Sequence, residues 1–234
     1  MDKRKLALLA ALGATTIYGL NHTIAKEVMP TYIQGFGFVQ VRLLGAAILF
    51  WFFSFFIPKQ SIARTDLPRM LLCALLGMAV NMLCFFKGIE FSTPINSAVL
   101  ITITPILVFV FSVFLIKERL GLSRVVGVLL GFLGALVLIL FGNELRQDAP
   151  NIPLGNTLFL FNAASFGMYL VLVKSLSAKY TTVHLLKWLF SFGFLMALPF
   201  TYKEFGAVSW SELPFEAIWR FGYVVLATTF LTYL

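Results

Sequence analysis

Long apolar runs, each about the length of a membrane-crossing helix, alternate with short polar breaks along the whole sequence. Crossing the roughly 30 Å hydrocarbon core of a bilayer takes about 20 mostly apolar residues in a helix. By that measure the chain contains eight candidate spans, at residues 6–25, 34–57, 69–89, 94–116, 124–142, 154–174, 183–202 and 216–234. Prolines and polar clusters such as DAPNIP (148–153) mark the breaks. The pattern predicts an all-α polytopic membrane protein, folded as a helical bundle.

Composition supports the same class. Of the 234 residues, 60% are apolar and 12% are charged, and the mean hydropathy is +0.93. A soluble domain has about 45–50% apolar and about 25% charged residues. A soluble fold of this size cannot hide so much apolar surface, so we expect the lipid bilayer to be the solvent. The positive charges behind the net +8 lie mostly at span ends and in short loops, which argues against nucleic acid as a partner.

Lysine and arginine are distributed unequally between the two ends of the spans. Twelve lie in the N-terminal tail, in the loops after the second, fourth and sixth spans, and at the start of the seventh span, whereas five lie at the opposite ends. Cytoplasmic loops of membrane proteins are enriched in these residues. The pattern therefore predicts a cytoplasmic N-terminus for a multi-pass protein of the cell's inner (plasma) membrane.

Two expectations concern the ends of the sequence. The basic cluster Lys3–Lys5 and the apolar run after it leave a cleaved signal peptide and an uncleaved first span both open. The run continues beyond the usual length of a signal peptide's apolar region, and no clear cleavage site follows, which favours the span. The eighth run is still apolar at Leu234, so we expect the sequence to end within or just after a span.

A short internal similarity suggests a repeat. YGLNHTIAK (18–26) aligns with FGMYLVLVK (166–174), which places Gly19 on Gly167 and Lys26 on Lys174 at a spacing of 148 residues. Five spans separate the two starting points, so the second copy crosses the membrane in the opposite direction. Inverted repeats of this kind place a substrate site near the middle of the membrane, between the halves.

The stretch from residue 85 to 139 has a more specific pattern. A turn rich in small residues, serine and threonine leads into a span that contains Pro105 and ends in Lys-Glu-Arg (117–119), and the next span has glycines at 127, 131 and 134. This pattern resembles the EamA-type branch of the drug/metabolite transporter superfamily. The resemblance covers the whole first half and about three spans of the second. It implies two inverted five-span repeats, here residues 1–146 (spans 1–5) and 150–234 (spans 6–8, incomplete).

Polar residues on one face of the first span are candidates for a binding site. Thr15, Tyr18, Asn21, His22 and Lys26 fall within a sector of about 140° on a helix. Such a stripe must face protein or a watery cavity, because polar groups lack partners in lipid. For Tyr18, Asn21 and His22, a cavity wall and interhelical hydrogen bonding both stay open. For Lys26 we favour a side chain that extends to water at the outer interface.

Further candidates lie on other spans. Asn162, Ser165 and Tyr169 share one face of the sixth span, where substrate contact and helix packing are again both open. Asn81 and Asn96 add polar points to the third and fourth spans. Arg42, inside the second span, needs a partner or water. We expect either an ion pair with Glu27 or Glu90, or a role in binding an anionic group.

No chemical motif indicates an enzyme. The chain has two histidines, His22 and His184, and lacks HExxH, GxSxG and Walker motifs, so we expect no catalytic site, metal or cofactor. Polar residues on several spans and an inverted repeat indicate a secondary transporter of a small-molecule substrate. The resemblance implies export of small metabolites, such as amino acids or related solutes, by alternating access. A non-transporting assembly or sensor protein is the alternative, and a coupling proton at His22 and a homodimer stay open.

Overall fold

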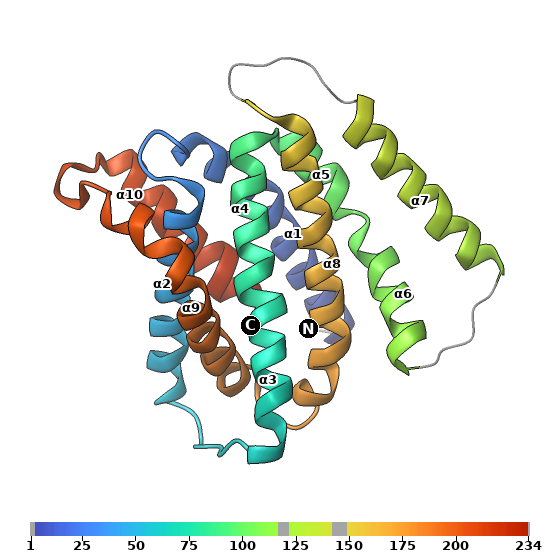
Figure 1. Cartoon of the computed structure of the whole chain (residues 1–234). Helices are drawn as coiled ribbons and strands as arrows, with labels where there is room; N and C mark the ends of the chain where they lie inside the picture. Colours follow the sequence, from blue (N-terminus) through green and yellow to red (C-terminus); the bar gives the residue numbers. More distant parts are fainter. Residues whose placement is uncertain (1–2, 117–121, 142–148, 234) are drawn as a thin grey trace.

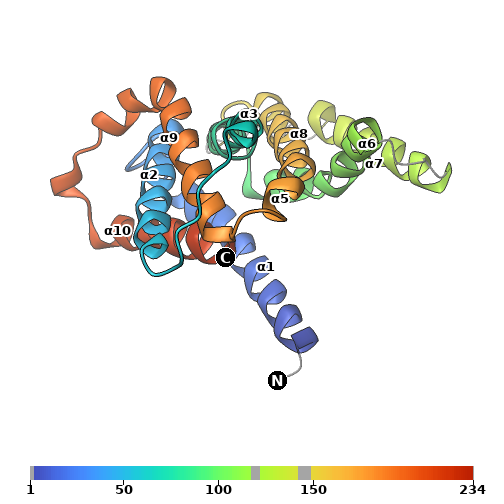
Figure 2. The same cartoon turned by 90° about the horizontal axis from the view of Figure 1, so that it is seen from below.

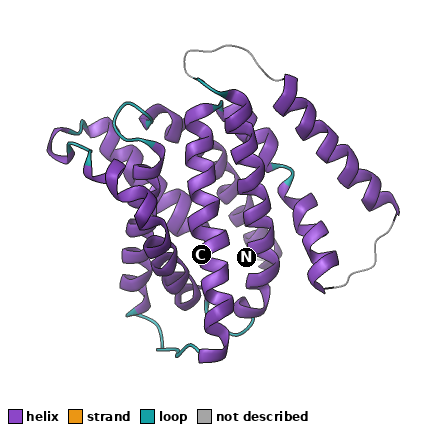
Figure 3. Cartoon of the chain, in the orientation of Figure 1, coloured by secondary structure: helices purple, strands orange, loops and turns teal. Residues whose placement is uncertain are grey.

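Every regular element that the structure describes is helical. The computed structural model describes residues 3–116, 122–141 and 149–233, and Figure 3 shows helices joined by loops over these ranges, without a strand. Five helices are long and apolar enough to cross a membrane: Gly35–Ser54, Arg64–Phe91, Pro94–Leu115, Ile152–Ser177 and Thr182–Gly206. This confirms the prediction of an all-α polytopic membrane protein.

The helices coincide with the eight predicted spans. The first two are α1 (Lys3–Val28) and α2 (Gly35–Ser54), and the third is built from α3 (Leu67–Ala74), the π-helical turn η2 (Leu75–Val80) and α4 (Asn81–Phe91). The fourth consists of α5 (Pro94–Ile101) and α6 (Thr104–Ile116), followed by α7 (Leu122–Phe141), α8 (Ile152–Ser177) and α9 (Thr182–Gly206). The eighth is α10 (Phe215–Gly222) continued by a second π-helical segment, η4 (Tyr223–Leu231).

The fourth span is broken where its proline predicts a break. Proline lacks an N–H group, and its ring collides with the carbonyl of the residue four positions earlier. For Pro105 that residue is Ile101, and α5 ends there; after a two-residue turn, α6 begins at Thr104. The interruption of the fourth span therefore lies where Pro105 prevents the helix from continuing.

The helices pack as two neighbouring groups. α2 packs along α9 and α4 packs along α8, with α6 on a further flank of α8. In Figure 1, α4 and α8 stand in the middle, α2, α9 and α10 lie on one side, and α6 and α7 lie on the other. Seen from below, the N-terminal part of α1 projects from this body (Figure 2). The largest fully buried side chains of the interior are phenylalanines: Phe38, Phe50, Phe86, Phe159 and Phe190.

Helix lengths and π-helical segments recur at the spacing found in the sequence. α1 and α8 each have 26 residues. α3 and α10 each have eight residues, and each runs directly into a π-helical segment. From Leu67 to Phe215, and from Leu75 to Tyr223, the spacing is 148 residues, as it is from Gly19 to Gly167. Two copies of one helical unit would produce this pattern, while the domain limits 1–146 and 150–234 remain predictions.

Candidate functional site

Arg42 is buried inside the bundle and bound by neutral groups. Its side chain comes from the second turn of α2 and is 4% exposed. Nε donates to Thr229 Oγ1 at 2.6 Å and Nη2 donates to the Thr228 carbonyl at 3.3 Å. The guanidinium carbon lies 5.6 Å from the centre of the Phe86 ring, within range of a cation–π contact.

The prediction that Arg42 forms an ion pair with Glu27 or Glu90 is wrong. Glu27 pairs instead with Arg220 at 3.0 Å, and Glu90 pairs with Lys87 at 2.6 Å. Both carboxylates lie near helix ends, where other cations pair with them, and Glu90 also accepts a hydrogen bond from the Gly35 N–H at the start of α2. Arg42 lies deeper in its helix, and η4 is the segment that reaches it.

Hydrogen bonds within the π-helical segment η4 orient the groups that accept from Arg42. Thr228 and Thr229 both donate their hydroxyl protons to the Val224 carbonyl, at 2.6 and 2.8 Å. A hydroxyl has one proton and two lone pairs, so Thr229 Oγ1 is left as an acceptor for the Nε–H of Arg42. Sequence reasoning missed both threonines. The available signal was a Thr-Thr pair inside the eighth apolar run.

Three tyrosines from different helices surround the same region. Tyr233 is close enough to Arg42, Tyr18 and Tyr169 to interact with each electrostatically. Tyr169 of α8 is 5% exposed, and its ring lies against Gly77 of η2. The structure thus brings the predicted residues Tyr18, Arg42 and Tyr169 together and adds Tyr233, which was not predicted.

His22 of α1 lies beside this cluster. Its Nδ1 is 2.6 Å from Ser97 Oγ, and its ring meets Phe85 edge-on at 5.4 Å between centroids. Ser97 donates its own proton to the Pro94 carbonyl at 2.8 Å, so the proton shared with His22 belongs to Nδ1. Arg42 is close enough to His22 to interact with it electrostatically. The neighbouring Asn21 is 1% exposed, and its Oδ1 has no hydrogen-bond partner among the described residues.

Asn81, Asn162 and Ser165 bond to backbone groups between helices. Asn162 Nδ2 donates to the Asn81 carbonyl at 2.8 Å, and Asn81 Nδ2 donates to the Asn162 carbonyl at 3.4 Å. Ser165 Oγ donates to the Leu76 carbonyl inside η2. A π-helical turn disrupts the regular hydrogen bonding of an α-helix, so such carbonyls need other donors. These three candidates join α8 to the third span, in line with the packing interpretation.

Asn96 and Lys26 both act at the α4–α5 connection. Asn96 Nδ2 donates to Asn156 Oδ1 at 3.1 Å and to Ser92 Oγ at 3.3 Å, which ties α5 to α8. Lys26 Nζ donates to the Ile89 carbonyl at 2.7 Å and to the Ser92 carbonyl at 3.1 Å. The prediction that the Lys26 side chain extends to interfacial water is therefore wrong. The unpaired carbonyls and the negative dipole end of α4 attract its ammonium instead.

Polar contacts close both ends of the bundle. We call Asp66, Lys179 and Tyr180 the lower clasp, because the segment before α3 and the α8–α9 connection, which carry them, lie at the bottom of Figure 1. Lys179 Nζ lies 2.9 Å from Asp66 Oδ1, and the Tyr180 hydroxyl donates to Asp66 Oδ2 at 2.8 Å. This clasp joins the segment before α3 to the α8–α9 connection.

Lys87, Glu90 and Glu204 form the upper clasp. Lys87 bridges the two carboxylates at 2.6 and 3.5 Å, and Glu204 accepts the Gly37 N–H at 2.9 Å. α9 is thereby held to α2 and α4 at the end opposite the lower clasp.

The glycines of α7 are mostly open. Among the described atoms, nothing lies within 4 Å of a Cβ placed on Gly127 or Gly134, whereas one on Gly131 would meet Ile106 of α6. Leu129, Leu130, Leu133 and Val137 on this helix are more than half exposed. This face is free for contact with lipid or with another protomer.

The interior cluster can bind a polar solute through hydrogen bonds and one positive charge. Tyr18, Arg42, Tyr169 and Tyr233 supply donors from separate helices, and Asn21 has an acceptor to spare. Over the described ranges, no group of three or more His, Cys, Asp or Glu side chains is placed to hold a metal ion. What these groups offer is recognition of an anion or a zwitterion.

Residues 5–140 match the model of a family described as the EamA-like transporter family. The chain is 25% identical to the uncharacterized transporter YetK of Bacillus subtilis, over 97% of this chain and 67% of that protein. It is 27% identical to the uncharacterized inner membrane transporter YicL of Salmonella typhimurium, over 100% of this chain and 78% of that protein. It is 24% identical to the WAT1-related protein At3g28100 of Arabidopsis thaliana, over 96% of this chain and 70% of that protein. No solved structure shows significant similarity to the chain.

Proposed function

The chain belongs to the EamA-like transporter family and is a membrane transporter, and from this premise we propose that it exports small metabolites that carry a carboxylate. Amino acids and related solutes are the substrate class we favour. The proposal includes alternating access as the mechanism and assigns the protein no catalytic step. Its setting is the inner membrane, with the N-terminus and the lower clasp on the cytoplasmic side.

One observation carries the choice of substrate class: Arg42 is buried, and its hydrogen-bond partners among the described residues are all neutral. An unpaired charge inside a membrane protein is costly, and such residues commonly mark substrate pathways. Of the five N–H groups of a guanidinium, the hydrogen bonds to Thr229 and Thr228 occupy two. A carboxylate pairs with the remaining fork of donors better than any neutral group does. A substrate carboxylate at Arg42 would supply the missing negative charge.

The ammonium group of a zwitterion would also have hydrogen-bond partners near Arg42. The Tyr18 and Tyr233 phenols are close enough to interact with each other, and Tyr233 also interacts electrostatically with Arg42. Asn21 lies one turn from Tyr18 on α1, and its buried Oδ1 is free to accept a hydrogen bond. We assign the ammonium group of an amino acid to that acceptor. The α1 stripe then contributes to the site through Tyr18 and Asn21, while Lys26 holds the end of α4.

Alternating access is supported by the recurrence of elements and by the two clasps. The repeated spacing of 148 residues is that of two inverted units, and corresponding helices, α2 and α9, pack against each other. Both clasps join the first unit to the second. With both ends tied, the described conformation fits an occluded state. In our proposal the lower clasp opens to load substrate from the cytoplasm, and the upper clasp opens to release it.

Two further partners belong to this proposal. His22 is the histidine beside the interior cluster, and we assign it the coupling proton. The exposed apolar face of α7, with Gly127 and Gly134 open, is where we place a homodimer contact.

The test is solute efflux from liposomes that contain the purified protein. The liposomes are loaded with equal amounts of amino acids and of the matching amines that lack the carboxylate, and mass spectrometry follows both. We expect the amino acids to leave and the amines to stay. Arg42→Gln should slow amino-acid efflux about tenfold or more, the loss expected for hydrogen bonds to a charged group. Glu212→Gln, in an exposed turn, is the matched control and should leave the rate unchanged.

Each other outcome has a distinct meaning. Equal efflux of amines and amino acids would remove the carboxylate assignment and leave transport standing. The absence of efflux for every loaded solute would favour the assembly or sensor alternative. Inverted membrane vesicles, which accumulate exported solutes, test the direction of transport separately.

A further inference from the structure

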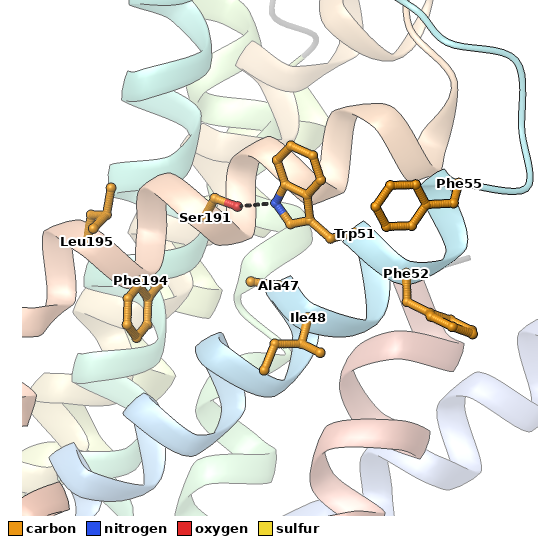
Figure 4. Close-up of a pocket in the computed structure, with 8 residues that line it drawn as sticks. All are labelled: Ala47, Ile48, Trp51, Phe52, Phe55, Ser191, Phe194 and Leu195. Atoms are coloured by element: carbon orange, nitrogen blue, oxygen red, sulfur yellow. Dashed lines mark hydrogen bonds between the residues drawn. The ribbon is translucent and has the colours of Figure 1, made fainter.

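An apolar groove runs along the outside of the bundle between α2 and α9. Its volume is about 530 Å³, and its lining residues are Ala47, Ile48, Trp51, Phe52, Phe55, Ser191, Phe194 and Leu195. Figure 4 shows the α2 residues and the α9 residues lining it from the two helices. Both helices are long and apolar enough to cross the membrane, so the groove runs along membrane-crossing elements.

The polar atoms of the groove satisfy one another. Trp51 Nε1 donates to Ser191 Oγ at 3.0 Å, the bond drawn in Figure 4, and Ser191 Oγ donates to the Lys187 carbonyl at 2.6 Å. The indole and the hydroxyl therefore have no unmet donor to offer an occupant. What remains is a hydrocarbon surface, and the occupant of such a surface is itself a hydrocarbon chain.

A positive charge lies at one end of this surface. Lys187 is one helical turn before Ser191 on α9, and its Nζ lies 4.5 Å from the Trp51 ring centre and 6.0 Å from that of Trp188. The residue is only 9% exposed. In the part of the chain that the structure describes, no carboxylate lies within ion-pair distance of its ammonium. Two aromatic faces stabilise the charge in part, and an anion is still missing.

The arrangement of charge and groove fits the shape of one kind of molecule. From Lys187 to Leu195 the α9 backbone rises about 12 Å, so a chain in the groove would extend two turns away from the charge. Tryptophans beside a lysine are typical of the level where lipid headgroups meet hydrocarbon. Lys59 lies in the loop at this same end, Arg64 begins the short helix η1 (Arg64–Asp66) that follows it, and α9 begins there with the positive end of its dipole. We propose that this groove binds an anionic glycerophospholipid, with the phosphate at Lys187 and an acyl chain along Ile48 and Leu195.

Native mass spectrometry of the detergent-purified protein tests the proposal. The protein is mixed with equal amounts of phosphatidylglycerol and phosphatidylcholine that have the same acyl chains. We expect retained phosphatidylglycerol to exceed phosphatidylcholine about fivefold, the preference that one basic residue near a membrane surface confers. Lys187→Gln should abolish the preference and Lys187→Arg should keep it. Lys203→Gln is the matched control, because Lys203 lies at the other end of α9 and also faces an aromatic ring, that of Tyr202.

A second variant tests the groove itself. Leu195 is 59% exposed, so Leu195→Trp can fill the groove without disturbing the interior, and it should reduce retention of both lipids. Equal retention of the two lipids by the unchanged protein, or the same behaviour of Lys187→Gln and Lys203→Gln, would overturn the proposal. Competition by glycerophosphoglycerol, which has the headgroup without acyl chains, would show a phosphate site and not a lipid site. A dimer that Leu195→Trp dissociates would show that a second copy occupies the groove.

Discussion

The Tyr223 hydroxyl donates a hydrogen bond of 2.9 Å to the Ile17 carbonyl, joining η4 to α1. At the spacing of 148 residues, Ile17 corresponds to Ser165 and Leu75 to Tyr223. Ser165, in turn, donates to the carbonyl of Leu76 in η2. Leu76 corresponds to Val224, the residue after Tyr223, so the two bonds join neighbouring positions of the repeat, and each runs from one unit to the other. η2 is thus bonded to α8, and η4 is bonded to α1 as well as to Arg42 of α2.

Removing either hydroxyl tests whether the two bonds are equivalent. Tyr223→Phe and Ser165→Ala should each lower the free energy of unfolding by about 1 kcal/mol, the usual net contribution of one hydrogen bond. Thermal unfolding in detergent micelles measures both. Thr157→Val, which removes a hydroxyl bonded within its own helix α8, is the control and should cost less. A large loss for one variant and none for the other would mean that the two contacts are not counterparts.

Gly77 is a position where only glycine fits. A Cβ there would overlap the Tyr169 ring, and overpacking of this kind costs about 1–3 kcal/mol. We expect Gly77→Ala to lower the unfolding temperature and to reduce transport, because Tyr169 belongs to the interior cluster. The control is Gly222→Ala, since nothing lies within 4 Å of a Cβ at Gly222. If both variants unfold alike, the close approach of Tyr169 to η2 does not matter for stability.

Breaking the lower clasp should expose the interior from that end. Asp66→Asn removes the charge that holds Lys179 and weakens the hydrogen bond from Tyr180. Lys179 is 58% exposed, so the effect is modest, and we expect labelling of the buried Cys73 thiol by a maleimide to quicken roughly twofold to fivefold. Lys59→Gln, an exposed change in the same loop, should have no effect. Unchanged labelling in Asp66→Asn would show that the clasp does not limit opening.

Proton coupling at His22 predicts a response to an imposed gradient. Efflux from liposomes should quicken when the outside is made more acidic than the inside, because protons then move inward against the exported solute. His22→Gln should abolish that response. Ser97→Ala keeps the imidazole while removing its hydrogen-bond partner, so it should keep the response. A gradient effect that survives in His22→Gln would assign coupling to another group.

Hydropathy predicted the fold well because every helix that crosses the lipid needs about 20 mostly apolar residues. The break of the fourth span was also predictable, since a proline excludes the hydrogen bond that would continue the helix. The π-helical segments were not. Leu75–Val80 and Tyr223–Leu231 read as ordinary apolar sequence, and their widened turns depend on what packs beside them.

The candidate site was harder to predict because depth in a membrane says nothing about which residues meet. Arg42 was identified as a residue in need of a partner, yet the partner lies 187 positions away at Thr229. Asn81 and Asn162 were each recognised as polar, but only the structure shows that they bond to each other's backbone. Lys26 satisfies helix carbonyls that no sequence pattern marks.

In the alternating-access cycle that we propose, the two clasps have a thermodynamic consequence. Their contacts belong to the protein, which returns to its starting conformation after every cycle, so their free energies cancel over the cycle. The ratio of solute concentrations at which net flux stops depends only on the solute and on any coupled ion. Strengthening or weakening Asp66–Lys179 or Lys87–Glu204 therefore alters how quickly that ratio is approached and leaves its final value unchanged.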